Sequence, residues 1–472
     1  MENNSLFGDR TEMDEIVSKT FSKEIGESLS LDVPVKVIGD ERLDSYFSVS
    51  ALAASVIGAV GSSIASLVKD LGLLRGNPNV RVDQRLASLW FHQSIYPIGW
   101  DLPPIWDSVA GDYQTCDGWI KLHTNLAHHR LAALKVLGVA RNREQVNAAV
   151  RCWKAHDLES EIVNEGGVVA AMRSMQEWQG HPQGMAVATE PLIVWDTLRD
   201  VKISFSPTSK ERPLEGLKVL DLTRVLAGPV ATRTLAGFGA KILRIDPPSW
   251  EEANVVPDVT LGKRCAHLDL SRTKDKETFE QLLRGADVLV HGYRPGALSN
   301  LGYSESVRNS LSPNLIEVSI DAYGWTGPWA RRRGFDSLVQ MSSGIADAGM
   351  HWAGLANPTP LPVQALDHAT GYLMAAAVIS LIRTALNGQG VGKARLSLAR
   401  TAELIKAHRQ TRKSPLNTVP SSKDFLQKIE LTPWGKSHRL RSALSITGVR
   451  IEWEHAANNL GSSEASWLPV LD

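Results

Sequence analysis

The sequence predicts an α/β protein, in which a Rossmann-like parallel sheet with flanking helices is joined to a smaller α+β domain. Short apolar runs at 217–222, 241–245, 288–291 and 315–320 have the length and composition of strands buried in a parallel sheet. Helical patterns lie between these runs, as they do in βαβ units. An earlier stretch, 117–184, combines a strand with several short amphipathic helices, which predicts the smaller domain.

The loop after the first of these strands, residues 223–229, is the centre of the predicted site. Gly228 and Pro229 form a strong turn signal, and a proline there is well placed to open a helix over 230–238. Gly239 is expected to end that helix at the C′ position. Sheets of this kind bind ligands at the carboxyl ends of their strands, so this loop is expected to line a binding site.

Two further loops, 262–264 and 292–296, carry glycine or basic residues and are interpreted as strand-end loops of the same site. The dinucleotide fingerprint is absent, because the first loop has one glycine, which comes late and is followed by proline. Asp246 lies where a ribose-binding acid would lie, but a lone acid at a strand end is more typical of a turn. NAD is therefore not expected as a ligand, and no P-loop is present.

The composition excludes several function classes. Lys and Arg number 51, and Asp and Glu also number 51, so nothing in the overall charge favours nucleic acid or a membrane surface as a partner. We expect no apolar run to be long enough to span a bilayer, and the polar, acidic N-terminus does not resemble a targeting peptide. Cys116, Cys152 and Cys265 are widely spaced, which is typical of a reducing compartment and predicts a cytoplasmic protein without a metal.

The histidines His128, His129 and His181 lack a second ligand at fixed spacing. Each is therefore more typical of a surface or hydrogen-bonded histidine than of a metal ligand. Asn125 is expected to cap a helix over 126–139.

We divide the chain into five predicted parts. These are a leader at 1–30, an N-terminal half at 31–203, a linker at 204–212, the Rossmann-like domain at 213–405 and a C-terminal tail at 406–472 that packs back on the chain.

Asp367 opens an apolar, small-residue helix that runs to Leu386, and its carboxylate has two interpretations. It is either an N-cap that stabilises the helix by about 1 kcal/mol, or a functional carboxylate whose anion the helix dipole favours. Spacing alone favours the cap by about two to one, because a carboxylate in a perturbed environment marks a functional site in some proteins and only a structural one in others. Residues 331–333 are three arginines, which suit either a solvated loop or a phosphate.

Five segments resemble the family III CoA-transferases, the CaiB/BaiF family, which includes formyl-CoA, carnitine-CoA and bile-acid-CoA transferases and the α-methylacyl-CoA racemases. They follow one another in family order over residues 214–400. The resemblance implies the family fold, with a Rossmann-like large domain, a linker and a small domain, and two chains forming interlocked rings, hence a homodimer. The segments are 214–229, 235–248, 262–270, 286–296 and 334–367.

The resemblance also implies roles for single residues. Asp367 matches the aspartate that becomes acylated during CoA transfer, and Asp336 is expected beside the site and not at the attacking position. The racemases have a histidine where this chain has Phe335, which removes one residue of a two-base racemase site. The residues expected to contact CoA are Val225, Leu226, Ala227, Lys263, Arg264, Arg294, Arg333 and Phe335.

The order of the parts departs from the family, because a stretch resembling the small domain precedes the Rossmann-like part. An internal repeat would explain this order, since 49–91 and 369–405 share a helix, a Gly/Asn turn, a strand and a second helix. Coincidence remains the alternative. In the first copy the counterpart of Asp367 falls near Val49 and is absent, so one acylatable carboxylate per chain is expected.

The resulting functional hypothesis is acyl-CoA:carboxylate CoA transfer through an aspartyl-CoA intermediate, with CoA as a substrate and no metal. The predicted partners are an acyl-CoA and a small carboxylic acid. The alternatives are a non-catalytic acyl-CoA-binding subunit and an acyl-CoA racemase or isomerase, the latter disfavoured by Phe335.

Overall fold

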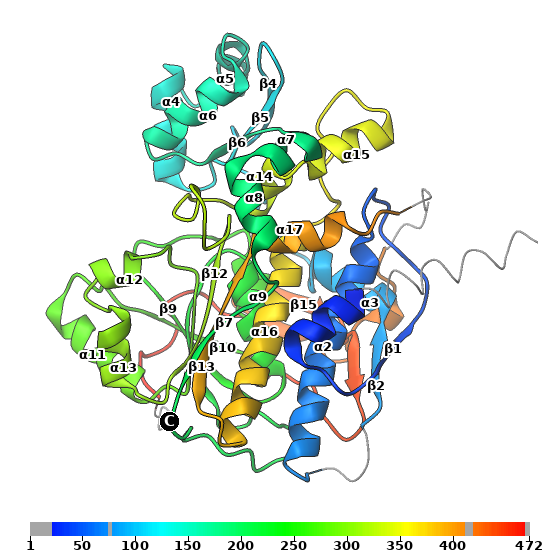
Figure 1. Cartoon of the computed structure of the whole chain (residues 1–472), viewed down its shortest axis with the longest axis vertical. Helices are drawn as coiled ribbons and strands as arrows, with labels where there is room; N and C mark the ends of the chain where they lie inside the picture. The colour runs from blue at the N-terminus through cyan, green and yellow to red at the C-terminus, as the bar shows by residue number, and fades with distance from the viewer. Residues whose placement is uncertain (1–20, 74–77, 411–418, 468–472) are drawn as a thin grey trace, which may run out of the picture.

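A computed structural model describes residues 21–73, 78–410 and 419–467 (Figure 1). Most of the predicted leader lies outside the described residues, and residues 21–29 are helical. The predicted linker lies between the last strand of the N-terminal half and the first strand of the Rossmann-like part.

The large sheet has seven strands in the order β10-β9-β8-β11-β12-β13-β7. All neighbours are parallel except β13 and β7, which are antiparallel. The strand order reverses between β8 and β11, so the topological switch point lies there. The predicted fold class is confirmed. The strands are β7 (Val194–Arg199), β8 (Lys218–Leu222), β9 (Lys241–Asp246), β10 (Lys263–His267), β11 (Val288–His291), β12 (Ile316–Asp321) and β13 (Val391–Ser397).

Helices cover both faces of this sheet. The side chains of α9 and α16 share one apolar core with the inward faces of β8 and β12. Side chains of α11 and of the loop before α13 share a second core on the other face. Figure 1 shows α11 and α13 at the left. The helices of this part are α9 (Ala227–Gly237), α10 (Val256–Val259), α11 (Thr273–Arg284), α12 (Ala297–Asn300), α13 (Glu305–Leu311), α16 (Ala365–Leu386) and α17 (Leu398–Lys406).

The first loop folds as predicted. Pro229 lies in the first turn of α9, and Gly239 follows its C-cap with a φ of +104°. That left-handed backbone is one that glycine adopts without the steric cost of a side chain.

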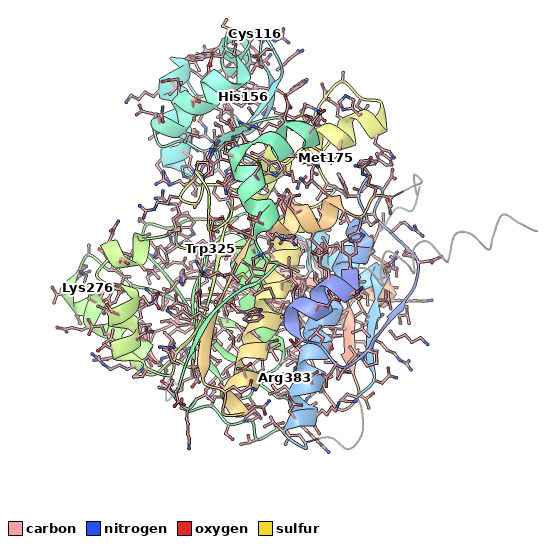
Figure 2. All side chains as sticks on the ribbon, in the orientation of Figure 1. Cys116, His156, Met175, Lys276, Trp325 and Arg383 are labelled. Carbon is pink, nitrogen blue, oxygen red and sulfur yellow. The ribbon has the colours of Figure 1, made fainter. Side chains whose placement is uncertain are left out.

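The N-terminal half places a second long helix, α2, along α16 (Figure 1). At their far ends Arg383 of α16 forms an ion pair with Asp70 of α2, with a separation of 2.8 Å (Figure 2). The order helix, strand, helix recurs as α2-β2-α3 and α16-β13-α17, which is the plan of the predicted repeat. The elements are β1 (Val35–Ile38), α2 (Val49–Asp70), β2 (Val80–Asp83) and α3 (Gln84–His92).

A small lobe, at the top of Figure 1, consists of a three-stranded antiparallel sheet and helices with their own apolar core. One local prediction is wrong: α4 has Leu126 as its N-cap residue, without a side-chain cap. The side chain of Asn125 instead bonds the backbone at Ile105 and Asp107. The elements are β4 (Gly111–Gln114), β5 (Trp119–Leu122), β6 (Val169–Ala171), α4 (Ala127–Leu137), α5 (Arg143–Val150), α6 (Ala155–Asn164), α7 (Met175–Gly180), α8 (Pro182–Thr189), α14 (Asp336–Ser342) and α15 (Ile345–Ala353).

The C-terminal segment returns to both halves. Strand β16 pairs with β2, and β15 pairs with β3. Further on, the backbone N–H of Ser463 donates to the carbonyl of Cys265 in β10. The elements are β3 (Ile95–Pro97), a short 3-10 helix (Ser422–Asp424), β14 (Glu430–Thr432), β15 (Gly435–Arg439) and β16 (Leu444–Ile446).

The expectation that no apolar run reaches membrane-spanning length is wrong. Helices α2 and α16 each have 22 residues and are apolar enough to cross a bilayer by length and composition. Most of each helix is buried inside the protein, and the core helices of folded proteins pass the same test, so this finding is weak evidence for a membrane.

Candidate active site

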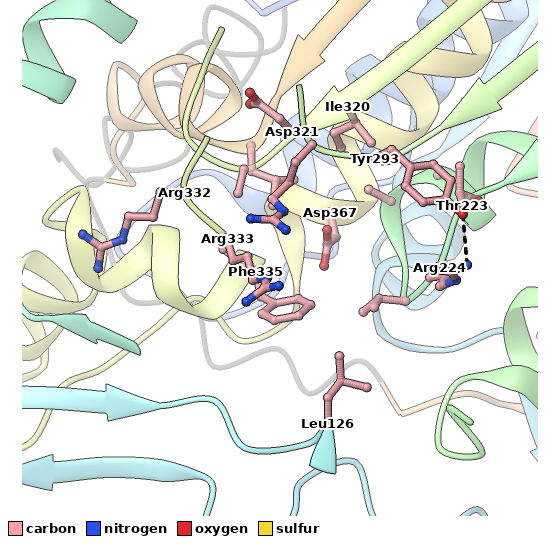
Figure 3. A pocket seen from close by; sticks show the side chains of 18 of the residues that line it. Leu126, Thr223, Arg224, Tyr293, Ile320, Asp321, Arg332, Arg333, Phe335 and Asp367 are labelled. Carbon is pink, nitrogen blue, oxygen red and sulfur yellow. Dashed lines mark hydrogen bonds between the residues drawn. The ribbon is translucent and has the colours of Figure 1, made fainter. Parts of the chain in front are cut away.

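A pocket of about 280 Å³ lies at the carboxyl ends of β8, β11 and β12, at the topological switch point of the sheet (Figure 3). The end of β12 contributes Asp321 to its wall, and the loops after β8 and β11 contribute Thr223 and Tyr293. The start of α4 in the small lobe closes it from the other side with Leu126 and His129. The pocket is therefore built from two parts of the chain that are far apart in the sequence.

Asp367 points into this pocket from the first turn of α16 (Figure 3). The N-cap residue of α16 is Gln364, so the N-cap interpretation of Asp367 is wrong. The residue is 8% exposed, and its carboxyl oxygens have no hydrogen-bond partner among the described residues. Burial, and then the charge of Asp336, raise the pKa of Asp367 well above its usual range. The carboxyl of Asp367 is therefore desolvated, and its oxygens accept no hydrogen bond within the described residues.

Asp336 holds the start of α16 in place. One of its carboxyl oxygens accepts a hydrogen bond of 2.8 Å from the backbone N–H of Asp367, and the other accepts one from the side chain of Gln340. Burial is the main cause that raises the pKa of Asp336. Two neighbouring buried carboxyl groups disfavour a double negative charge, so the pair holds one proton more readily than an exposed pair would.

The first loop is strained and tightly held. Val225 is β-branched but has a φ of +67°, a left-handed conformation that is rare for such a residue. Its N–H donates to the carboxylate of Glu252 at 2.9 Å. The guanidinium of Arg224 lies over the ring of Trp250 at 4.5 Å and over that of Tyr293 at 5.5 Å. These contacts fix the loop at the pocket wall.

Arginines rim the pocket on the side of the small lobe. Arg294, Arg332 and Arg333 line both the pocket and a second cavity of about 1160 Å³ beside it. Arg332 is paired with a buried carboxylate of the lobe at 2.8 Å. In the part of the chain that the structure describes, Arg294 and Arg331 form no ion pair. The junction of the two cavities therefore carries positive charge that an anionic ligand would balance.

The structure brings most of the sequence-predicted residues together and leaves three out. Leu226 is half-buried against the core beside the pocket, and Lys263 and Arg264 lie elsewhere. Residues 262–264 open β10 at its amino end, on the edge of the sheet opposite the pocket, so their interpretation as a strand-end loop is wrong. The residues that do line the pocket are Val225, Ala227, Arg294, Arg333, Phe335 and Asp367.

Lys263 and Arg264 are also occupied. The ammonium of Lys263, which is fully buried, donates to Asp221 and to the carbonyl of Pro229, at 3.0 Å each. The guanidinium of Arg264 donates to the carbonyls of Glu464 and Ser466 in the C-terminal segment. The structure thus offers neither side chain to a ligand in the pocket.

Sequence reasoning missed Asp321 and His129 in the wall of the pocket, and it named Arg332 only within the three arginines that suit a solvated loop or a phosphate. Asp321 is the last residue of β12, a position that strand-end logic could have marked. Burial raises its pKa well above the usual range. His129 comes from the small lobe, and no local pattern connects it with the sheet. Among the described residues, no group of three or more His, Cys, Asp or Glu is arranged to hold a metal.

Comparison with known proteins finds a match for the part of the chain that contributes most of this pocket. Residues 214–424 match CoA-transferase family III. The resemblance to this family is thereby confirmed. The match includes α16 with Asp367, the loops after β8 and β11, and helices α14 and α15, but not the strands and the other helices of the small lobe.

Several curated proteins are similar to the chain. An acetyl-coenzyme A transferase, nodX, of Hypoxylon pulicicidum is 36% identical over 39% of this chain and 32% of its own length. An acyl-CoA transferase of Gibberella moniliformis is 26% identical over 70% of this chain and 64% of its own. The human succinyl-CoA:glutarate CoA-transferase is 34% identical over 38% of this chain and 44% of its own. The chain thus spans less than two thirds of these relatives.

Comparison with solved structures also finds proteins that are similar to part of the chain. A CaiB/BaiF family protein from Brucella suis is 26% identical, and the alignment covers 48% of this chain and 65% of that one, with a TM-score of 0.36. Rv3272 from Mycobacterium tuberculosis is 27% identical over 42% of this chain and 58% of that one, with a TM-score of 0.38.

Proposed function

We propose that the protein transfers CoA from an acyl-CoA to a carboxylic acid, with Asp367 as the group that carries the CoA. The observation that supports this most is the carboxyl of Asp367 itself. It is buried, has no hydrogen-bond partner among the described residues and faces a pocket rimmed by arginine, within the segment that matches CoA-transferase family III. Similar proteins named as CoA-transferases act between two acids, such as the succinyl-CoA:glutarate enzyme.

The chemistry follows from covalent catalysis by a carboxylate, which divides one difficult transfer into easier steps. The Asp367 carboxylate attacks the thioester carbonyl, the C–S bond breaks and CoA leaves as its thiolate, which gives a mixed anhydride. The thiolate then attacks the Asp367 carbonyl and displaces the donor acid as a carboxylate, leaving an aspartyl-CoA thioester. The acceptor carboxylate repeats these steps in reverse, so the aspartate is regenerated and no net proton or electron is exchanged.

The residues around Asp367 suit these steps. Desolvation leaves its carboxylate without competing hydrogen bonds, which favours attack on a carbonyl carbon. Ala227 and Gly228, in the first turn of α9, line the pocket, and the backbone N–H groups of a first helical turn have no acceptor within their own helix. Such donors would stabilise the oxyanion that forms on the attacked carbonyl.

The arginines at the junction of the two cavities would hold the phosphates of CoA. Arg294 and Arg333 line both cavities, and guanidinium groups bind phosphate well because they offer several N–H donors in one plane. In this arrangement the thioester end of CoA reaches Asp367 while the phosphates stay near the second cavity.

The proposal includes a homodimer as the working assembly and a cytoplasmic location, both of which come from the family resemblance and the cysteine pattern. Sedimentation equilibrium tests the dimer, because it predicts a species of twice 51.6 kDa at micromolar concentration. A single 51.6 kDa species would contradict it.

Intact-mass measurement tests the proposed function directly. The protein is incubated with a panel of acyl-CoAs and quenched, and the expected result is a mass increase equal to the acyl group or to CoA. Hydroxylamine should remove the adduct and leave a hydroxamate at Asp367, and the Asp367→Asn variant should form none. An adduct that persists in this variant would place the nucleophile elsewhere. If no acyl-CoA modifies the wild-type protein although CoA binds, the chain is a binding subunit instead.

A further inference from the structure

Gln340 connects the carboxyl pair to the loop before α16. It lies in α14, one helical turn after Asp336, and its side chain is fully buried. Its side-chain oxygen accepts a hydrogen bond of 2.7 Å from the backbone N–H of Leu361, and its side-chain nitrogen donates to Asp336. A backbone N–H can only donate, so Leu361 fixes which end of the amide faces it. The amino group of Gln340 is therefore held against Asp336.

Both carboxyl oxygens of Asp336 accept a hydrogen bond. One accepts from the side chain of Gln340, and the other accepts from the backbone N–H of Asp367 at 2.8 Å. Hydrogen bonds from donors favour the charged form of a carboxyl. The surroundings of Asp336 therefore favour its anion, although the residue is buried.

Asp367 has the opposite surroundings. It is buried as well, but its carboxyl oxygens accept no hydrogen bond within the described residues. Burial raises the pKa of Asp336 to about 6, whereas burial and the charge of Asp336 raise the pKa of Asp367 well above its usual range. When the pair holds a single proton, that proton is therefore on Asp367.

The elements that pack against α14 bring few other charges to Asp336. Lys121 on β5 lowers the pKa of Asp336, but less than the hydrogen bond from Gln340 does, and its ammonium is already paired with Asp112 at 2.9 Å. The remaining titratable groups have their own partners: Lys406 pairs with Glu403 on α17, Asp347 pairs with His351 on α15, and His368 of α16 stacks on Phe91.

We infer that Gln340 is a positioning residue of the proposed reaction, which keeps Asp336 ionised and so leaves the proton of the pair on Asp367. The inference rests on the proposed function and deepens it by naming what controls the nucleophile. As the pH rises, Asp367 releases this proton to solvent, and its anion then lies beside the charge of Asp336. Acylation converts that anion into a neutral anhydride, so it relieves the repulsion between the two carboxylates. The repulsion thereby favours attack on the thioester.

Infrared titration of Asp336 tests the hydrogen bond without turnover. In the full chain carrying Asp367→Asn, the C=O band of the protonated Asp336 carboxyl is followed against pH, with Asp336→Asn/Asp367→Asn as the reference. Gln340→Met keeps a side chain of similar length but has no N–H donor. It should move the midpoint up by about one pH unit, because a hydrogen bond to a charged group is lost. An unchanged midpoint would overturn the inference.

The pH profile of kcat/KM tests the consequence for the nucleophile. With Asp336 present, Gln340→Met should move the acid limb to lower pH by about one unit, because an Asp336 that keeps its proton no longer repels the anion of Asp367. In the Asp336→Asn background the same substitution should leave the limb in place, since Gln340 acts through Asp336. Equal shifts in both backgrounds would contradict this role.

Gln183 offers a matched control. It is also fully buried, its side-chain nitrogen donates to the carbonyls of Tyr323 and Thr326, and its oxygen accepts the N–H of Trp329. Gln183→Met should lower the thermal stability, as Gln340→Met does, but leave the infrared midpoint and the acid limb unchanged. Like shifts in both variants would overturn the inference alone. Absence of turnover with any acyl-CoA would overturn the proposed function, and with it the role of Gln340, whatever the infrared titration shows.

Discussion

The two long helices of the molecule, α2 and α16, are alike in length and packing but differ at their first turns. Helices α2 and α16 have 22 residues each, pack along one another and are each followed by a strand and a second helix. Yet the first turn of α2 contains no acid, whereas that of α16 contains Asp367. At the start of α2, Ser50 bonds the backbone of Leu43 and the hydroxyl of Ser88. The start of α16 instead opens into the pocket at the strand ends.

The difference teaches that the helix is a scaffold and that its surroundings supply the chemistry. The start of α16 meets the strand-end loops of a parallel sheet, and Asp336 accepts the N–H of Asp367. The start of α2 packs neither against these strand-end loops nor against an acid like Asp336. Four predictions test this contrast, beginning with the largest expected effect.

Substitution of Asp367 by asparagine should lower the rate of CoA transfer by at least about 10³-fold, because an amide cannot form the anhydride. Folding and CoA binding should be unchanged, since Asp367 caps nothing and its carboxyl oxygens have no partner among the described residues. Initial rates and isothermal titration with CoA measure the two effects. Asp336→Asn is the control and should cost less, because the amide oxygen still accepts the N–H of residue 367. Equal losses in both variants would contradict the assigned roles.

Matched glycine substitutions in the two helices should have unequal effects. A methyl group on Gly371 of α16 would lie 2.4 Å from the backbone carbonyl of Ala227, which belongs to the pocket loop. A methyl group on Gly61 of α2 would meet only the ends of the side chains of Leu444 and Val80. Side chains can move where a backbone cannot, so Gly371→Ala should lower the free energy of unfolding by about 1–3 kcal/mol and also lower activity.

Gly61→Ala should cost less stability and leave the transfer rate intact. Urea unfolding and initial rates of the two variants decide the matter. If Gly61→Ala lowers activity as much as Gly371→Ala, then α2 contributes to the pocket after all.

The pH dependence should report the carboxyl pair of α16. Because the pKa of Asp367 is raised by burial and by the charge of Asp336, its reactive anion forms only above the usual range of a carboxyl, which is about 4. The rate should therefore fall as the pH drops through this raised pKa. Asp336→Asn removes the neighbouring charge, so the acid limb of the profile of kcat/KM should move to lower pH. A limb that stays in place would show that Asp336 carries no charge beside Asp367.

The smallest effect is expected from placing an acid in the counterpart helix. Ala51 is the third residue of α2, as Asp367 is the third of α16, and it is half-buried. Ala51→Asp should change the free energy of unfolding by only about 0.3–1 kcal/mol through the helix dipole, and it should not restore transfer to Asp367→Asn. Recovery of activity in the double variant would show that the two helix starts are equivalent.

Sequence reasoning reached the sheet and its central loop because both depend on local pattern. The apolar runs indicate strands, Pro229 indicates the start of a helix and Gly239 its end. Each of these signals depends only on residues that are close in the sequence. The same reasoning failed at Lys263, because it did not establish at which end of its strand the residue lies. A loop that precedes a parallel strand lies on the opposite edge from one that follows it.

Other features depend on contacts between distant segments. The bond from the N–H of Asp367 to Asp336 joins two helices, and the approach of His129 to the pocket joins two lobes. Neither leaves a periodic trace in the sequence. Asp321 is the exception, since its position at the end of β12 was available to the strand-end argument.

The return of the C-terminal segment has a consequence for how the protein is made. Strand β2 lies between β1 and β16, so one of its edges is completed only by residues near Ile446. A ribosome that adds about 5–20 residues per second reaches β16 roughly 20–70 s after β2. Until then the nascent chain presents an unpaired strand edge, which is a template for aggregation. Chaperone demand should therefore fall on the N-terminal half during synthesis, although that half contains neither Asp367 nor the large sheet's parallel strands.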